Sequence, residues 1–123
     1  MNPPQSTICC KVCTIHLERM EIDRQGQVLI LSPNEAKLLG HLAENMDRTV
    51  ATETLLETAW GYRPGLTSSA VKNAVYRLRK KMERDPKHPD HLISVRGVGY
   101  RLEASTDFAD LPVRMTSQAP QVG

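Results

Sequence analysis

Three polar side chains, Lys72, Asn73 and Arg77, have types and a spacing suited to one kind of chemistry. The guanidinium of arginine can donate two hydrogen bonds to guanine O6 and N7, and the amide of asparagine can pair with adenine N6 and N7. A lysine is a point charge better suited to phosphate, although Lys72 lies early enough in its segment to reach a base. Asn73 and Arg77 are therefore our first candidates for hydrogen bonding to base edges.

Positive charge is concentrated in the same part of the chain. Residues 72–101 hold nine basic and three acidic residues and a net charge of +6, whereas residues 1–71 and residues 102–123 each carry a net charge of −2. A concentrated basic patch favours a polyanionic partner more than a uniformly basic surface does. The alternative is an ordinary solvated helix face. Within the patch, Lys80 is a second point charge suited to phosphates.

A helix is expected to hold these side chains. Thr67 or Ser68 can cap its first turn, and we expect it to run to about Arg84. Apolar residues recur at helical steps along it, which indicates one buried face. They are Val71, Val75, Leu78 and Met82. Ser69 and Tyr76 lie with the basic residues on the opposite face, toward solvent or a ligand.

A short hairpin is expected to follow this helix. Residues 91–95 and 99–102 are predicted strands, joined by a tight turn at residues 96–98 in which glycines remove steric limits. Arg96 in the turn suits a narrow minor groove, where the electrostatic potential is most negative. A basic helix beside such a hairpin can place one element in each groove of DNA.

The middle of the chain predicts two further helices. The first begins at residues 32–35, because the serine can cap it, the proline suits the first helical position and the glutamate can reach back to the cap N–H. Its predicted buried residues are Ala36, Leu39, Leu42, Ala43 and Met46. The second is expected over residues 52–60 and is followed by a loop at residues 61–66. Its predicted inward residues are Leu55, Leu56 and Ala59.

The ends of the chain complete the expected organisation. Residues 8–31 are rich in β-branched and apolar residues, with a turn signal at residues 23–26, and predict several short antiparallel strands. Residues 1–6 are expected to be a flexible N-terminus, and residues 104–123 a disordered tail.

Six segments, taken together, match a known family. They are Leu31-Ser32-Pro33-Asn34-Glu35, Leu55-Leu56-Glu57, Trp60-Gly61-Tyr62, Val71, Arg77-Leu78-Arg79-Lys80-Lys81 and Val95-Arg96-Gly97-Val98-Gly99-Tyr100-Arg101-Leu102. Over residues 13–102 the chain resembles the winged-helix DNA-binding domain of OmpR/PhoB-type response regulators. The resemblance implies an α+β winged helix-turn-helix domain over residues 7–103, with an N-terminal antiparallel four-stranded sheet, a three-helix core and a C-terminal β-hairpin wing.

The resemblance also implies where such a domain would touch double-stranded DNA. The third helix, about residues 67–84, would enter the major groove, and the wing, about residues 92–102, the minor groove. Base contacts are implied for Lys72, Asn73 and Arg77, and a minor-groove contact for Arg96. Backbone contacts are implied for Trp60, Ser69, Tyr76, Arg79 and Ser94, to which the charge of Lys80 adds a further one.

Several of these side chains have alternative roles. Arg79 can form an intramolecular salt bridge, and Tyr76 can be a partly buried packing residue. Trp60 can pack as well as approach a phosphate. Tyr100 is expected to be structural, with its ring against the core.

The chain also departs from the family's pattern. Ala36 replaces a residue that is usually a large aromatic, so the core near the first helix must be filled differently. Ala51 stands where a serine normally caps the second helix, which weakens the cap or shifts it to Thr52. The chain has no room for the ~120-residue receiver domain that such regulators carry, so we expect no control by phosphorylation of an attached aspartate.

A cysteine cluster, Cys9, Cys10 and Cys13 with His16 three residues further on, suggests metal or redox chemistry only weakly. No second cysteine pair has zinc-site spacing, and on a strand Cys10 and Cys13 would point to opposite faces. Three reduced strand cysteines are expected, and a redox-sensitive thiol next to Lys11 is the alternative. The remaining histidines, His41, His88 and His91, fit surface or loop positions.

These features favour a sequence-specific transcriptional regulator that binds duplex DNA, with a second copy on a tandem half-site and RNA polymerase as a further partner. The rival hypothesis is a winged-helix protein-interaction module that contacts polymerase or another regulator through residues 60–66 or the tail. A third is a thiol or metal sensor on the same fold. No catalytic arrangement, cofactor site or membrane-spanning run is present in the sequence, so we expect a cytoplasmic protein that is not an enzyme.

Overall fold

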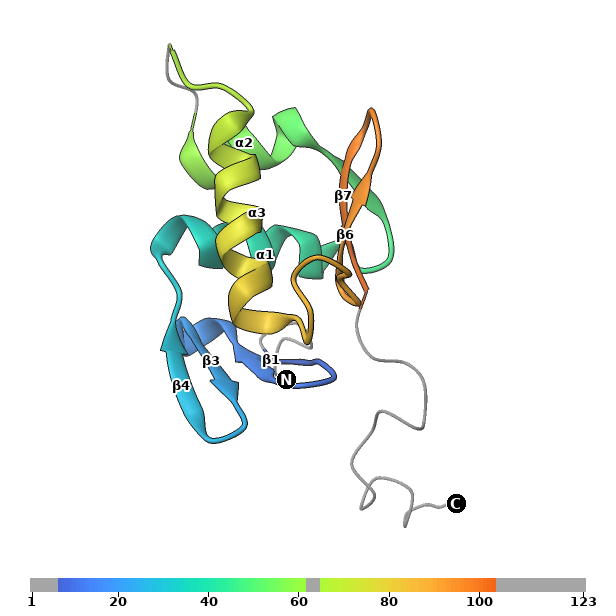
Figure 1. Ribbon diagram of the computed structural model, residues 1–123. Coiled ribbons are helices and arrows are strands. Elements are labelled where there is room, and N and C mark those ends of the chain that lie inside the picture. Colours follow the sequence, from blue (N-terminus) through green and yellow to red (C-terminus); the bar gives the residue numbers. More distant parts are fainter. Residues whose placement is uncertain (1–6, 62–64, 104–123) are drawn as a thin grey trace.

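Two antiparallel sheets flank a group of three helices (Figure 1). The computed structural model describes residues 7–61 and 65–103. The predicted order of short strands, helices and a closing hairpin is confirmed, and with it the α+β architecture. The expectations for the N-terminus and the tail concern residues outside the described ranges.

The N-terminal sheet has the strand order β1-β2-β3-β4. Its strands are β1 (Thr7–Cys9), β2 (Thr14–His16), β3 (Glu21–Arg24) and β4 (Gln27–Ile30), with a 3-10 turn, η2 (Leu17–Arg19), between β2 and β3. Ile8, Ile15 and Ile22 lie opposite one another on neighbouring strands and are buried. The turn from β3 to β4 is the predicted one, since Gly26 has φ +90° and donates its N–H to Asp23 Oδ1 at 3.1 Å.

Helix α1 (Pro33–Glu44) begins where the sequence predicts. The N–H of Glu35 donates to Ser32 Oγ at 3.1 Å, and the N–H of Ser32 donates to Glu35 Oε1 at 3.0 Å, so the capping box is formed. The buried face differs slightly from the prediction. Leu38, which was not predicted, is fully buried, whereas Ala36 and Met46 are only partly buried.

Helix α2 (Thr52–Trp60) follows a short strand, β5 (Thr49–Ala51), that the sequence did not predict. The cap of α2 does not shift to Thr52, because Ala51 remains the N-cap and contributes no side-chain hydrogen bond. The N–H of Thr52 donates instead to Val98 O at 3.1 Å. A backbone carbonyl of the hairpin therefore partners the N–H of the first helical residue, whereas a capping serine would accept from an N–H one or two residues further along.

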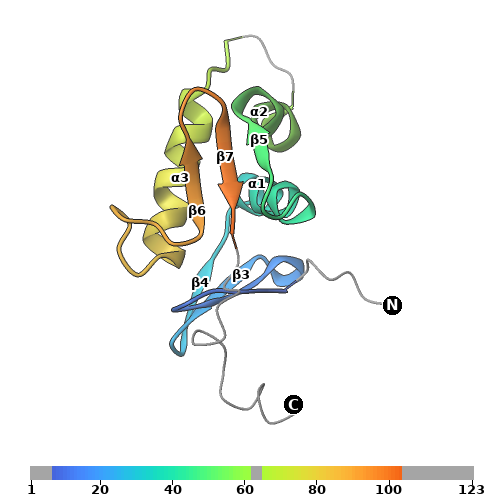
Figure 2. The same ribbon diagram turned by 90° about the vertical axis from the view of Figure 1, so that its right-hand side faces the viewer.

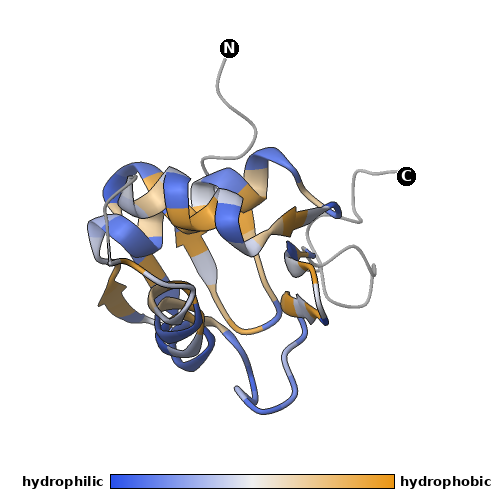
Figure 3. Ribbon diagram, turned by 90° about the horizontal axis from the view of Figure 1, so that it is seen from above, coloured by the Kyte–Doolittle hydropathy of each residue, from blue (hydrophilic) through white to orange (hydrophobic). Residues whose placement is uncertain are grey.

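Helix α3 (Ser69–Met82) carries the predicted apolar face. Val71, Val75, Leu78 and Met82 are buried, and Ala74 is buried beside them. Seen from above, hydrophobic residues lie along the surfaces at which the helices and strands face one another, and hydrophilic ones lie outside (Figure 3). None of the described helices is long and apolar enough to cross a bilayer.

The hairpin consists of β6 (Leu92–Val95) and β7 (Gly99–Leu102), with the predicted turn between them. With β5 it forms a second sheet in the order β5-β7-β6, beside the helices (Figure 2). Gly99 is required here, because a Cβ at this position would collide with the carbonyl oxygen of Val50 on β5. Tyr100 is buried, which confirms its structural role.

Candidate nucleic-acid interface

The outward face of α3 brings together most of the predicted contact residues. Ser69, Lys72, Asn73, Tyr76, Arg77 and Lys80 are all exposed. Tyr76 is 62% exposed, so the alternative in which it is a partly buried packing residue is wrong. The ammonium of Lys80 lies over the Tyr76 ring, 5.0 Å from its centroid, and this contact presents an aromatic surface together with a positive charge.

Arg77 is exposed but not free. Its Nε donates to Oε2 of Glu35 on α1 at 2.9 Å, and its side chain is 50% exposed. Lys81, one turn further along α3, binds the other oxygen of the same carboxylate at 2.7 Å. Sequence analysis predicted the capping role of Glu35 but not its second role as an acceptor for two basic residues of α3.

Arg79 lies on the other flank of α3 and binds the hairpin. Its Nε and Nη2 donate to Leu92 O at 3.0 and 2.8 Å, and Nη2 also donates to Ser94 Oγ at 2.8 Å. The intramolecular alternative for Arg79 is thus realised through a carbonyl and a hydroxyl, not through a salt bridge. Because these bonds hold β6 against α3, Arg79 and Ser94 set the position of the hairpin relative to the exposed helix face.

A surface groove separates the beginning of α3 from the hairpin. It is lined by Thr52 and Glu53 of α2, by Lys72 of α3 and its N-cap Ser68, and by hairpin residues that include Ser94 and Arg96. Arg96 is exposed at the turn, where Gly97 takes φ +78°. The groove therefore carries a basic and a hydroxyl side chain from each side, together with one carboxylate, that of Glu53. The two basic side chains outnumber the carboxylate, so the lining is net positive and suits an anionic strand.

Trp60 ends α2 and is partly buried against the core. In the amide orientation of Asn34 that satisfies both of its polar atoms, Asn34 accepts from the indole N–H of Trp60 at 2.7 Å and donates to Ala59 O at 3.1 Å. The packing role of Trp60 is confirmed, and its indole donor already has an internal partner. Tyr62, in the neighbouring loop, lies outside the described residues.

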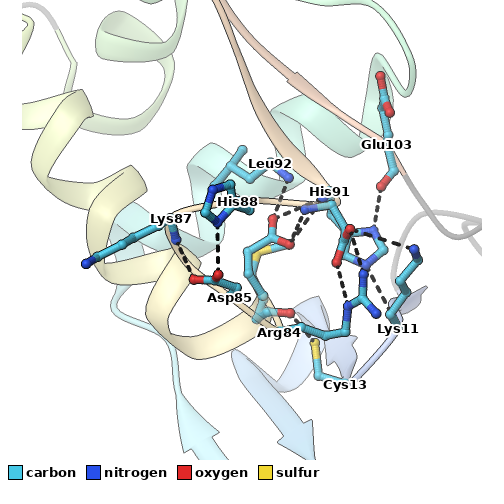
Figure 4. Close-up of polar contacts among 12 residues, drawn as sticks. Lys11, Cys13, Arg84, Asp85, Lys87, His88, His91, Leu92 and Glu103 are labelled. Carbon is cyan, nitrogen blue, oxygen red and sulfur yellow. Dashed lines mark hydrogen bonds and ion pairs between the residues drawn. The ribbon is translucent and has the colours of Figure 1, made fainter.

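The C-terminal end of α3 has a different character, because its charged groups bind other parts of the chain (Figure 4). Glu83 is fully buried and accepts backbone hydrogen bonds from Asp90, His91 and Leu92 at 2.7 to 3.2 Å. Arg84 donates to Asp90 at 2.9 and 3.2 Å, and this contact holds the pKa of the Asp90 carboxyl below its usual range. The sequence does contain a signal for the structural role of Glu83. It is an acidic residue directly after a basic run at a helix C-terminus, where cations are favoured.

His91 corrects a second prediction. It was expected at a surface or loop position; it does lie in a bend just before β6, but it is buried and not at the surface. Its Nε2 accepts from the N–H of Lys11 at 3.0 Å, and its Nδ1 donates to Glu103 O at 2.8 Å (Figure 4). The ring therefore ties the β1–β2 turn to the residue that follows β7, with Nε2 as the acceptor and Nδ1 as the donor.

The cysteines are also arranged differently from the prediction. Cys10 and Cys13 are not strand residues with opposed side chains; they close the turn between β1 and β2, with Cys10 N–H donating to Cys13 O at 2.8 Å, and both are buried. A hydrogen bond to Cys13, together with burial, raises the pKa of the Cys10 thiol. Cys9 is exposed on β1. Among the described residues, no group of three or more Cys, His, Asp or Glu could hold a metal ion.

Comparison with known proteins places this arrangement in a family. The family model described as "Transcriptional regulatory protein, C terminal" matches residues 26–102, which include α1, α2, α3, strands β4 and β5 and the hairpin. The chain belongs to this family. The match begins at the turn before β4 and ends with β7, so it contains the exposed face of α3 and both sides of the groove.

A curated member of the family is similar in sequence. It is the "DNA-binding response regulator MtrA" of Mycolicibacterium smegmatis (strain ATCC 700084 / mc(2)155), which is 41% identical over 81 residues. The similarity covers 66% of this chain and 36% of MtrA. The chain thus spans about a third of the length of that relative.

Solved structures of the family share the fold. The response regulator DrrB of Thermotoga maritima, an OmpR/PhoB homologue, has a TM-score of 0.70 and 28% identity, covering 80% of this chain and 45% of DrrB. The DNA-binding domain of CpxR from E. coli has a TM-score of 0.64 and 28% identity, covering 84% and 98%. The Klebsiella pneumoniae RstA DNA-binding domain, solved in complex with the RstA box, has a TM-score of 0.63 and 28% identity, covering 79% and 96%. The winged-helix fold of OmpR/PhoB-type effector domains is therefore confirmed.

Proposed function

We propose that this domain binds duplex DNA at specific sequences and regulates transcription, with α3 in the major groove and the β6–β7 hairpin at the minor groove. The observation that carries the proposal is the exposed polar face of α3, which holds Lys72, Asn73 and Arg77 beside a groove that Arg96 enters from the hairpin. Family membership supports it, since a relative of the same fold was crystallised with its DNA box.

The proposed roles follow from the chemistry of each side chain. Asn73 and Arg77 read bases, because an amide and a guanidinium can each make paired hydrogen bonds to a base edge. Lys72 reaches a base or a phosphate from the helix start, and Arg96 occupies the minor groove. Backbone contacts are proposed for Trp60, Ser69, Tyr76, Arg79, Lys80 and Ser94.

We further propose that a second copy of the domain binds an adjacent half-site. One domain of this size covers an interface of roughly 600 to 1,000 Å², which limits the specificity of a single copy. In vitro selection of bound DNA tests this part directly, because tandem binding requires two half-sites at a fixed spacing in the selected sequences.

Fluorescence anisotropy with selected and scrambled duplexes tests the function as a whole. Affinity for both should fall with salt, by about 0.9 logarithmic unit per logarithmic unit of salt for each phosphate contact. Arg77→Ala should lower affinity for the selected duplex by about tenfold or more and affect the scrambled duplex much less, because a bidentate base contact is lost. Equal binding of the selected duplex by Arg77→Ala and the parent chain would show that another residue reads the bases. Retention of a protein partner without any DNA binding at low salt would favour the interaction-module hypothesis.

A further inference from the structure

The proposed base-reading arginine is held by a carboxylate from another helix. Arg77 Nε donates to Glu35 Oε2 at 2.9 Å, across 42 residues of sequence. The side chain of Arg77 is 50% exposed, whereas that of Glu35 is 1% exposed. A buried acceptor thus binds a donor at the surface, and this geometry differs from an ion pair in which both partners move in solvent.

Glu35 is fixed independently of Arg77. Its Oε1 accepts from the N–H of Ser32 at 3.0 Å and from Nζ of Lys81 at 2.7 Å, and Lys81 Nζ also donates to Ile30 O at 2.8 Å. Burial opposes ionisation, but the hydrogen bonds from Lys81, Ser32 and Arg77 outweigh it and hold the pKa of Glu35 below its usual range. The carboxylate is therefore charged and stationary at neutral pH, with Oε2 directed to the guanidinium.

This contact restricts what the guanidinium can offer to DNA. Guanidinium donors form a planar, rigid set, so holding the Nε–H restricts the orientation of the whole group. The two terminal amino groups remain, and within the described residues Arg77 has no other polar partner. Two parallel donors at the end of a group of restricted orientation match guanine O6 and N7.

We infer that Glu35 is a positioning residue for base recognition by Arg77, an inference that rests on the proposed function. Glu35 orients the guanidinium, and its negative charge reduces the attraction of that guanidinium to phosphates. Both effects act in one direction on selectivity: the bidentate contact forms readily at the correct base, and the attraction of Arg77 to any nearby phosphate is weakened. Glu35 thereby increases discrimination and lowers non-specific affinity.

The test compares Glu35→Gln with the parent chain on a selected duplex and a scrambled duplex over a range of KCl concentrations. Glutamine can still accept from Ser32 and Lys81, but its amide nitrogen cannot accept from Arg77. Non-specific affinity should rise about threefold, with a salt slope steeper by up to about 0.9, because Arg77 is released to phosphates. The ratio of selected to scrambled affinity should fall about tenfold. A structural defect would lower affinity for both duplexes, so the rise in non-specific binding distinguishes positioning from damage.

Glu21→Gln is the matched control. It removes the same charge from an ion pair on the N-terminal sheet, Arg19–Glu21 at 3.3 Å, and should leave the affinity ratio within about twofold. Glu35→Asp provides a second arm that keeps the charge and an acceptor for the helix cap. Because its side chain is shorter by one methylene, it withdraws from Arg77, and the ratio should fall while non-specific affinity stays unchanged.

The outcomes separate the two proposals. A parent chain that shows neither a selected site nor salt-dependent binding overturns both. A parent chain that discriminates, with Glu35→Gln and Glu35→Asp retaining the ratio within twofold, overturns the role of Glu35 and leaves the proposed function intact. An equal loss on both duplexes for folded Glu35→Asp also overturns it, because that pattern is a structural effect.

Discussion

The exposed face of α3 and the C-terminal end of the same helix are both rich in charge, yet they behave differently. On the exposed face, the side chains of Lys72 and Asn73 have no polar partner among residues 7–61 and 65–103. At the C-terminal end, Lys81 binds Glu35 and Ile30, and Arg84 binds Asp90. One end of the basic run thus holds the fold together, and the other part is left for a ligand.

The difference shows that the number of charges in a run does not measure its capacity to bind DNA. A cation that already bonds a buried carboxylate or a carbonyl gains less from a phosphate, because its internal partner is left unsatisfied unless its remaining donors make the contact. The net charge of +6 over residues 72–101 therefore overstates the charge available to DNA. Substitutions that change either stability or DNA affinity, but not both, can test this division between the structural end of α3 and its exposed face.

The largest expected effect is at the structural end. Glu83→Ala leaves the N–H groups of Asp90, His91 and Leu92 without their acceptor in a buried site. The free energy of unfolding should fall by about 3 kcal/mol or more, measured by urea denaturation. Glu83→Gln is the control and should cost less, since its amide oxygen still accepts. A loss below about 1 kcal/mol for Glu83→Ala would mean that water replaces the carboxylate.

A smaller effect should separate two neighbours in the basic run. Arg79→Ala removes the bonds to Leu92 O and Ser94 and should lower the free energy of unfolding by about 1 to 2 kcal/mol. Lys80→Ala should change stability by less than about 0.5 kcal/mol. On DNA, the Lys80 variant should reduce the salt slope by about 0.9, as expected for one lost phosphate contact. Urea denaturation and the salt dependence of DNA binding are measured for both variants. If Lys80→Ala destabilises the protein more than Arg79→Ala does, the proposed difference between these two residues is wrong.

Local rules explain what the sequence predicted correctly. The capping box at Ser32 and Glu35 and the turn at residues 96–98 depend on residues within a few positions of one another, and both are present. The buried face of α3 follows from its periodicity in the same way. Boundaries and faces set by neighbouring residues can be read from a single sequence.

Long-range contacts explain what it missed. His91 is buried because it bonds Lys11, 80 residues away in sequence, and no local pattern marks that pair. Strand β5 is short and exists by pairing with β7, so its formation depends on the hairpin. The predicted contact residues on α3 are exposed as expected, but the bond from Arg77 to Glu35 could not be seen from spacing alone. Their contacts with DNA stay predictions.

The smallest expected effect concerns Glu35, which touches both regions by binding Arg77 of the exposed face and Lys81 near the end of α3. Burial alone would raise its pKa, but the hydrogen bonds from Lys81, Ser32 and Arg77 lower the pKa below the ordinary value of 4.5. A carboxyl whose folded-state pKa is depressed contributes stability that is fully present above its unfolded-state pKa and is lost as the pH falls through the folded-state value.

The free energy of unfolding of the parent chain should therefore decline as the pH falls below about 4.5. Glu35→Gln should be less stable at neutral pH and should show a flatter decline, because glutamine does not titrate. Urea denaturation at a series of pH values from neutral to acid measures both curves, with Glu21→Gln as the control for a general loss of negative charge. Parallel curves for the parent chain and Glu35→Gln would mean that Glu35 does not join the two regions energetically, because its ionisation would then contribute equally to the folded and unfolded states.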